Sequence, residues 1–240
     1  MIVLKKEKII ALKARKVGGT SFEIALSKYA DKDSIVTPIS FDDEETRERL
    51  GWSGPRNYKI PFWELKNLGL ANIAKGFIRP RRLRKFWNHM PAFEVREKLG
   101  ERIWDSYMKI AIIRNPFDYM VSSYFWDVRE EFREKIGFEE FVLSNTDKLL
   151  WNKKIYEIGG KNIIDFMIRY DRLKDDLVQL ESMKPSLAGL AETMEKLNAK
   201  GNHRPPSATV EEMFKNSPRA HSLIYNVCMD DIERYNFEVP

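Results

Sequence analysis

The chain has 240 residues, of which 43% are hydrophobic and 32% are charged, and its formal net charge is +5. This balance excludes a largely disordered protein, and the length suits one α/β domain. A single cysteine, Cys228, excludes an intrachain disulfide and a cysteine-rich zinc site, and indicates a reducing compartment. The charged first twelve residues do not resemble a signal peptide, and no long apolar run predicts a membrane span. We therefore expect a soluble, cytoplasmic protein.

Short apolar runs alternate along the chain with stretches of helical periodicity. Strands are expected at residues 9–12, 35–39, 108–113 and 163–168. Helices are expected after Thr20 and at residues 42–50, 91–99, 117–135, 171–183 and 218–235. The proline-containing stretch 184–207 is expected to be irregular. The alternation predicts an α/β three-layer sandwich with a mainly parallel central sheet, in a single domain over residues 1–240.

A glycine-containing segment, KVGGTS at residues 16–21, links the first of these strands to the first helix. Glycines let the backbone turn sharply and approach a ligand, and the first N–H groups of a helix attract anions. The candidate phosphate ligands of this segment are Arg15, Lys16, Gly18, Gly19, Thr20 and Ser21. A Walker A loop is disfavoured, because its lysine would follow the glycines. A structural glycine turn capped by a hydroxyl is the alternative.

A second motif, RNPF, begins at Arg114, directly after the strand expected at 108–113. Ser122 follows Arg114 by eight positions and lies on the next predicted helix. An arginine at the carboxyl end of a strand can face a ligand crevice, and a serine in the next helix can face the same crevice. Together they suit a terminal phosphate. The alternative is a structural arginine paired with Asp118.

Both motifs resemble those of sulfotransferases that use 3′-phosphoadenosine 5′-phosphosulfate (PAPS) as the sulfuryl donor. The resemblance implies a P-loop NTPase-like sulfotransferase fold. It also implies that Lys16 contacts the bridging oxygen of the phosphosulfate, while Arg114 and Ser122 hold the 3′-phosphate. Ser123 fits the family spacing less well than Ser122. Arg15 departs from the family, which often has proline at that position.

His89 is the candidate general base. Imidazole has an ordinary pKa of about 6.5, so it can accept the proton of an acceptor hydroxyl near neutral pH. The sequence around His89 resembles carbohydrate-modifying sulfotransferases, in which a histidine between the two PAPS motifs is the base. A lone histidine is more often structural, so Glu94 and the acidic run at residues 42–45 are fallback bases, or else solvated helix faces.

The resemblance suggests three further residues of the nucleotide pocket. Tyr170, in a strand end where the family has Tyr-Glu and this chain has Tyr-Asp171, is a candidate for stacking on the adenine. Lys200 and Arg204 lie in a late basic loop of the kind that closes over the 3′-phosphate. A core tyrosine and a solvated loop are the respective alternatives.

Residues 75–88 are basic and aromatic, and they lie within an acceptor-side insertion expected at 41–90. They could bind an anionic carbohydrate, or they could form a solvated basic surface. The predicted function is transfer of a sulfuryl group from PAPS to a hydroxyl acceptor, with carbohydrate as the first expectation and with no metal and no nucleic acid. The alternatives are a P-loop-like kinase and a basic nucleic-acid-binding module.

Overall fold

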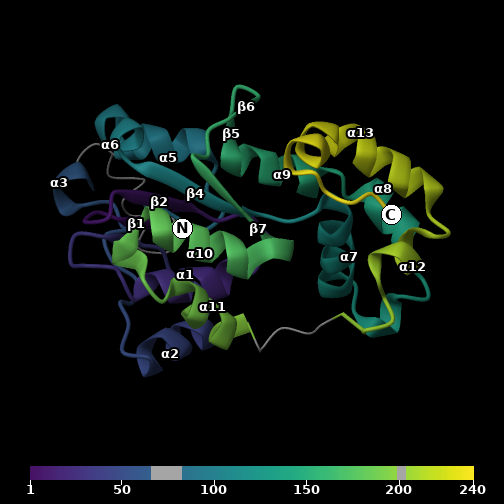
Figure 1. Ribbon diagram of the computed structural model, residues 1–240, viewed down its shortest axis with the longest axis horizontal. Coiled ribbons are helices and arrows are strands. Elements are labelled where there is room, and N and C mark those ends of the chain that lie inside the picture. The colour runs from purple at the N-terminus through teal and green to yellow at the C-terminus, as the bar shows by residue number, and fades with distance from the viewer. Residues whose placement is uncertain (66–82, 199–203) are drawn as a thin grey trace.

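The computed structural model describes residues 1–65, 83–198 and 204–240. Its centre is a five-stranded sheet in the order β3-β1-β2-β4-β7 (Figure 1). The strands are β1 Ile2–Leu4, β2 Ile9–Leu12, β3 Ile35–Val36, β4 Met108–Ile113 and β7 Phe166–Arg169. β2, β4 and β7 are parallel, whereas β1 pairs antiparallel with both β2 and β3. The α/β fold with a largely parallel sheet, predicted from the sequence, is therefore confirmed.

Helices cover both faces of this sheet. The longer described helices are α1 Gly19–Ser27, α2 Phe41–Arg49, α5 Ala92–Leu99, α7 Pro116–Asp127, α9 Asp147–Tyr156, α10 Leu173–Met183, α11 Leu190–Asn198 and α13 Pro218–Tyr235. Shorter ones are α3 Phe62–Leu65, α6 Glu101–Ser106, α8 Phe138–Ser144 and α12 Val210–Phe214. Figure 1 shows α5 and α6 on one side of the sheet and α1, α10 and α11 on the other. This is the three-layer arrangement.

The apolar character of the central strands explains the two helical layers. Successive side chains of a strand point to opposite faces of the sheet. Ile9 and Ile10 of β2 are both fully buried, as are Ile110 and Ala111 of β4, so each face needs a cover. Parallel strands with both faces buried are typical of α/β proteins. The short antiparallel pair β5 Glu157–Ile158 and β6 Lys161–Asn162 lies apart from this sheet.

Several boundaries expected from the sequence were wrong. The helix expected at 117–135 ends at Asp127, where the Arg133 side chain binds the carbonyl oxygens of Phe125 and Val128 and satisfies the end of the helix. The strand expected at 163–168 begins only at Phe166, because the Asp165 carboxylate accepts the N–H of Lys109 and interrupts the regular pairing.

Several described elements were not foreseen, among them α8, α9, α11 and β1, and one cap differs. The stretch 184–207 contains α11, whose start is stabilised because Glu181 accepts the N–H groups of Gly189 and Ala191. The first strand, β1, was missed because only three apolar residues form it. The N-cap of α2 is Ser40 rather than Asp42, with the Ser40 hydroxyl accepting the N–H of Asp43.

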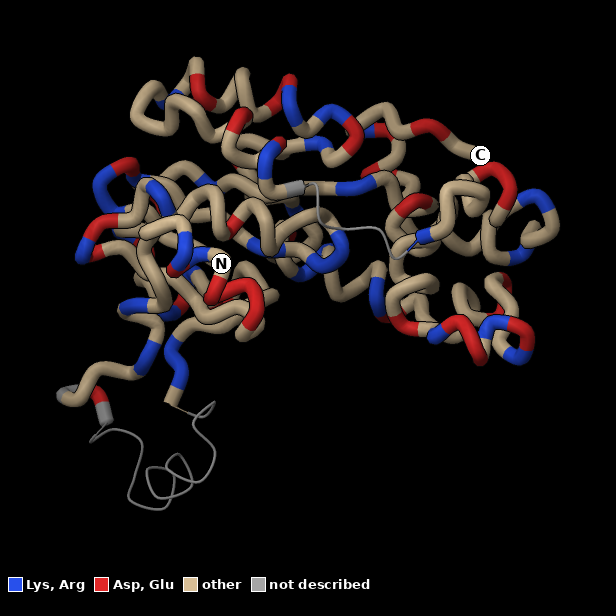
Figure 2. Tube along the Cα trace, turned by 90° about the horizontal axis from the view of Figure 1, so that it is seen from below, with Lys and Arg blue, Asp and Glu red and all other residues tan. Residues whose placement is uncertain are grey.

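Charge is distributed over the whole described chain. Figure 2 shows lysine and arginine interspersed with aspartate and glutamate in both halves of the molecule. Within the described ranges, no helix combines the length and the apolar character that crossing a bilayer requires. The cytoplasmic location and the single-domain organisation stay predictions.

Candidate functional site

A cavity of about 880 Å³ opens at the carboxyl ends of the parallel strands. β2, β4 and β7 end close together, since Leu12 pairs with Ala111 and Ile113 pairs with Arg169. The segments that leave these strands therefore meet at one edge of the sheet, where α/β proteins bind ligands. The predicted site residues that line the cavity are Arg15, Lys16, Gly18, Gly19, Thr20, Ser21, His89, Arg114, Ser122, Tyr170 and Arg204. Lys200 and the basic stretch 75–82 lie outside the described residues.

The loop between β2 and α1 is tightly built. Gly18, the residue that precedes α1, has a φ of 70°, a conformation that glycine adopts without strain. A side chain at Gly18 would lie 3.1 Å from the Tyr170 ring. None of the described side chains caps α1, so the N–H groups of its first turn are available to an anion in the cavity.

Lys16 also has a positive φ, of 58°, which is uncommon for a residue with a side chain. Its ammonium lies 3.9 Å from the centre of the Trp126 ring, at the end of α7. Burial, and secondly repulsion from Arg114, lowers the Lys16 pKa from 10.5 to about 8, while Asp127 opposes the shift. A partly desolvated cation of this kind is well placed to gain a negatively charged ligand.

Asp118 joins two arginines that are far apart in the sequence. Its Oδ2 accepts from Nε of Arg114 and its Oδ1 accepts from Nη1 of Arg204, each at 2.5 Å. The Arg114 guanidinium also donates to the carbonyl oxygen of Lys16 at 2.9 Å and lies 4.5 Å from the centre of the Tyr170 ring. The ion pair of Arg114 with Asp118, named as the structural alternative, is thus present, and Arg114 and Arg204 both line the cavity.

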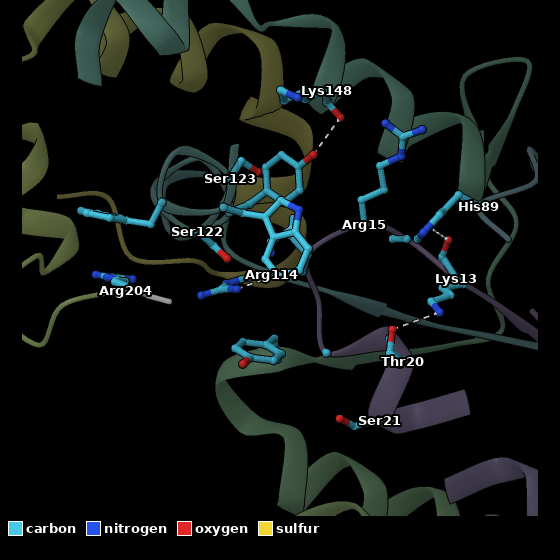
Figure 3. A pocket seen from close by; sticks show the side chains of 18 of the residues that line it. Lys13, Arg15, Thr20, Ser21, His89, Arg114, Ser122, Ser123, Lys148 and Arg204 are labelled. Atoms are coloured by element: carbon cyan, nitrogen blue, oxygen red, sulfur yellow. Dashed lines mark hydrogen bonds between the residues drawn. The ribbon is translucent and has the colours of Figure 1, made fainter. Parts of the chain in front are cut away.

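The two serines of α7 differ in their surroundings. Ser122 is half-buried and points toward Arg114, whereas Ser123 is fully buried on the side of Lys148 (Figure 3). Arg204 lies on the same side of the cavity as Ser122 and Arg114 (Figure 3). One end of the cavity therefore holds two arginines and a hydroxyl, a donor set suited to a phosphate.

His89 lies at the other end of the cavity, near Lys13 and Thr20 (Figure 3). Its Nδ1 is 3.0 Å from the carbonyl oxygen of Lys13. Because a carbonyl oxygen only accepts, Nδ1 carries the proton and Nε2 has the free lone pair. Burial, followed by the charge of Lys13, lowers the His89 pKa from 6.5 to about 4. The imidazole is therefore neutral at pH 7, as a proton acceptor must be. Of the fallback bases, Asp43 lines the cavity, whereas Glu94 does not.

The sequence motifs did not identify Lys13, its partner Glu23, or Asn152, which shape this site. Lys13 lines the cavity and forms a buried ion pair with Glu23 of α1. Asn152 of α9 fixes the loop by binding both the N–H and the carbonyl oxygen of Arg15, at 2.9 and 3.2 Å. Arg15 itself is exposed, with its guanidinium 5.2 Å from the centre of the Trp151 ring. Lys13 left one signal, a lysine directly after an apolar strand.

Comparison with known proteins identifies the family of this chain. The sequence matches the model of the sulfotransferase family over residues 1–238. The chain belongs to the sulfotransferase family. This sulfotransferase is also similar to an uncharacterized protein of Archaeoglobus fulgidus, with 31% identity over 94 residues, which are 38% of this chain and 78% of that protein. No solved structure matches the sulfotransferase. Its largely parallel α/β sheet agrees with the fold that the family implies.

Proposed function

We propose that this sulfotransferase transfers the sulfuryl group of PAPS to a hydroxyl group of a carbohydrate acceptor. The observation that carries the proposal is a single cavity with two ends that each suit an anion. One end has the start of α1, and the other has Arg114, Arg204 and Ser122, with the Lys16 ammonium near Arg114 and over the Trp126 ring. PAPS carries anionic groups at both its 5′ and 3′ positions, and so the charges of the cavity fit it. A ligand with a 5′-phosphate alone would leave the second end unmatched.

Tyr170 fits between these ends as a surface for the adenine. Its ring packs against Gly18 on one side of the loop and against the Arg114 guanidinium. An arginine that already lies over an aromatic ring is held in place, so less conformational entropy is lost when a phosphate binds it. The stacking role of Tyr170 is part of the proposal.

Each residue of the site has a defined chemical task in this proposal. Bound PAPS supplies the sulfuryl group and a phosphate leaving group. The Lys16 ammonium and the first N–H groups of α1 stabilise the charge that grows on the leaving oxygen. His89, neutral and with its Nε2 lone pair free, accepts the proton of the attacking hydroxyl. With PAPS held in the cavity and the acceptor hydroxyl beside His89, the proposed transfer is in line.

The acceptor is proposed to be an anionic carbohydrate. Beyond the proposed nucleotide residues, the cavity wall includes Trp126 and Lys148, and Trp126 is 57% exposed. An exposed indole suits the apolar face of a sugar ring. Lys148 pairs with Asp127 of the same wall at 2.9 Å, and a carboxylate or sulfate of the sugar would compete for this ammonium. The proposed acceptor-side insertion at 41–90 contributes Asp43 and His89 to the cavity wall.

The described part of the basic segment has local partners. Lys85 forms an ion pair with Glu64 at 2.8 Å, and Arg84 lies 5.9 Å from the centre of the Tyr58 ring. Neither residue lines the cavity. For these two positions the structure favours a surface role, and the acceptor contacts of the proposal rest on the cavity wall instead.

The test is a transfer assay with ³⁵S-labelled PAPS and three acceptors: a uronic-acid-containing oligosaccharide, a neutral oligosaccharide and a phenol. We expect label in the first, and loss of transfer by at least about 100-fold in Lys16→Met and in His89→Asn. Asparagine tolerates the positive φ of His89 and can still donate to the Lys13 carbonyl oxygen. Transfer to the phenol alone would overturn the carbohydrate assignment. Normal turnover by His89→Asn would remove His89 as the base.

A further inference from the structure

Lys13 is a buried lysine to which the proposed function gives no task. It follows β2 directly, and its side chain is 7% exposed. The ammonium forms an ion pair with Glu23 of α1, whose side chain is 2% exposed. It also donates to Oγ1 of Thr20 at 3.3 Å (Figure 3). Lys13 therefore connects the core of the protein to the first turn of α1.

Stability alone does not account for this pair. Desolvation of two charges costs about as much as their attraction returns, so a buried ion pair is weak evidence for a stabilising role. Glu23 also pairs with the buried Met1 ammonium, so the carboxylate would keep a cationic partner without Lys13. An apolar side chain would fit the position of Lys13 without any desolvation cost. The position of the ammonium beside the cavity points to a role there.

The side chain of Lys13 packs directly against Gly19 of the loop. A Cβ atom at Gly19 would lie 3.0 Å from Cγ and 3.3 Å from Cε of Lys13. The lysine stem thus occupies the space of the missing side chain, and this contact fixes the direction in which the ammonium points. The ammonium donates to Thr20, which follows Gly19 in the sequence and lines the cavity.

The hydrogen bond to Lys13 decides what the Thr20 hydroxyl can do. An ammonium group has donors only, so the Thr20 oxygen must accept, and the hydroxyl proton must point elsewhere. No acceptor for this proton exists among the residues that the structure describes. The proton is therefore left for an acceptor inside the cavity.

We infer that Lys13 is a positioning residue of the 5′-phosphate subsite, which holds the Thr20 hydroxyl as a donor toward the bound anion. Glu23 fixes the lysine and neutralises its charge, so that Lys13 acts through Thr20. This inference rests on the proposed function, because it requires a ligand with a 5′-phosphate in the cavity.

The test compares two ligands that differ only at the 5′ position, adenosine 3′,5′-bisphosphate and adenosine 3′-monophosphate, by calorimetry. The variants are Lys13→Met/Glu23→Gln, in which the buried Met1 ammonium, the second partner of Glu23, keeps Oγ1 of Thr37 and Oδ1 of Asn88 as acceptors, Thr20→Val, and the triple variant. We expect the first two each to weaken bisphosphate binding about tenfold, as for one lost hydrogen bond to a charged group. The monophosphate should bind to all variants as it does to the parent.

The triple variant separates a role through Thr20 from a direct effect of the lysine charge. If Lys13 acts through the hydroxyl, the triple variant binds the bisphosphate no more weakly than Thr20→Val does. A further tenfold loss in the triple variant, or parent-like binding by Lys13→Met/Glu23→Gln, would overturn the inference.

Two further results keep the test decisive. If Lys13→Met/Glu23→Gln binds neither ligand, Lys13→Gln/Glu23→Gln replaces it; the glutamine amide ends one bond short of the ammonium, and the same tenfold loss is expected. If the parent protein itself shows no preference for the bisphosphate over the monophosphate, the proposed function fails first. Failure of the inference alone would leave that preference intact in the parent.

Discussion

Arg114 shows how single residues prepare this cavity for an anion. Its Nε binds Asp118 and its Nη1 binds the Lys16 carbonyl oxygen, which hold the guanidinium plane in one orientation. Nη2 makes no hydrogen bond with the described residues, and Ser122 points toward the same guanidinium (Figure 3). A phosphate at this position would meet donors that are already oriented, so little side-chain entropy is lost on binding.

The adjacent serines of α7 offer a matched pair of variants. We predict that Ser122→Ala weakens binding of adenosine 3′,5′-bisphosphate about tenfold, because a hydroxyl donor to a charged phosphate is lost. Ser123→Ala should bind as the parent does, since Ser123 is 2% exposed and lies away from Arg114. Calorimetric titration of both variants measures the effect. A larger loss in Ser123→Ala would show that Ser123, and not Ser122, contacts the 3′-phosphate.

The pH dependence of kcat/KM follows from His89 and Lys16. His89 accepts a proton only when neutral, and its pKa of about 4 keeps it neutral at pH 5. Lys16 acts only when protonated, and its pKa is about 8. We predict a plateau of kcat/KM from pH 5 to about 7 and a decline above pH 8. A decrease of kcat/KM on the acid side, centred near pH 6.5, would instead indicate a base in an ordinary environment.

Most residues that the sequence motifs predicted for the site line the observed cavity. Lys16, Arg114 and Ser122 could be predicted because each lies at a fixed distance from a strand end or glycine turn. The bridge from Asp118 to Arg204 and the contact of Lys13 with Glu23 could not, because they depend on how distant segments fold together. Whether these residues bind PAPS stays a prediction that the binding experiments test.

At the scale of elements, the loop between β2 and α1 depends on a missing side chain at Gly19. We predict that Gly19→Ala weakens bisphosphate binding at least about tenfold and destabilises the fold by about 1–3 kcal/mol, because its Cβ would press on Lys13 and on the Ala14 carbonyl oxygen. Gly54→Ala is the control, since nothing lies within 4 Å of its added Cβ. Equal behaviour of the two variants in titration and thermal unfolding would contradict this view of the loop.

Elements with clear signals at both ends were predicted well. β4 and α13 have the bounds expected from the sequence, because an almost wholly apolar run marks β4 and an N-terminal proline marks α13. α11 was hidden between prolines, and its start depends on Glu181, a side chain from the preceding helix. Such a cap is a tertiary contact, and it has no local sequence pattern.

At the scale of the whole molecule, His89 couples the site to the stability of the fold. Its pKa is about 4 in the folded protein, whereas an imidazole of the unfolded chain has the ordinary value of 6.5. The unfolded chain therefore binds more protons between pH 4 and pH 6.5. Stability from this group is present above pH 6.5 and is lost as the pH falls toward 4. We predict that the parent loses about 2 kcal/mol relative to His89→Asn over this range, measured by urea unfolding. Parallel curves for the two proteins would contradict the shift.

The central claim is that one cavity recognises both phosphates of an adenosine 3′,5′-bisphosphate. The most direct measurement is calorimetric titration of the protein with this ligand, beside AMP and beside ATP with Mg²⁺. We predict tight binding of the bisphosphate and binding of AMP weaker by about 100-fold or more, because AMP leaves Arg114 and Ser122 without a ligand. Equal binding of AMP, or a preference for ATP with Mg²⁺, would contradict the account.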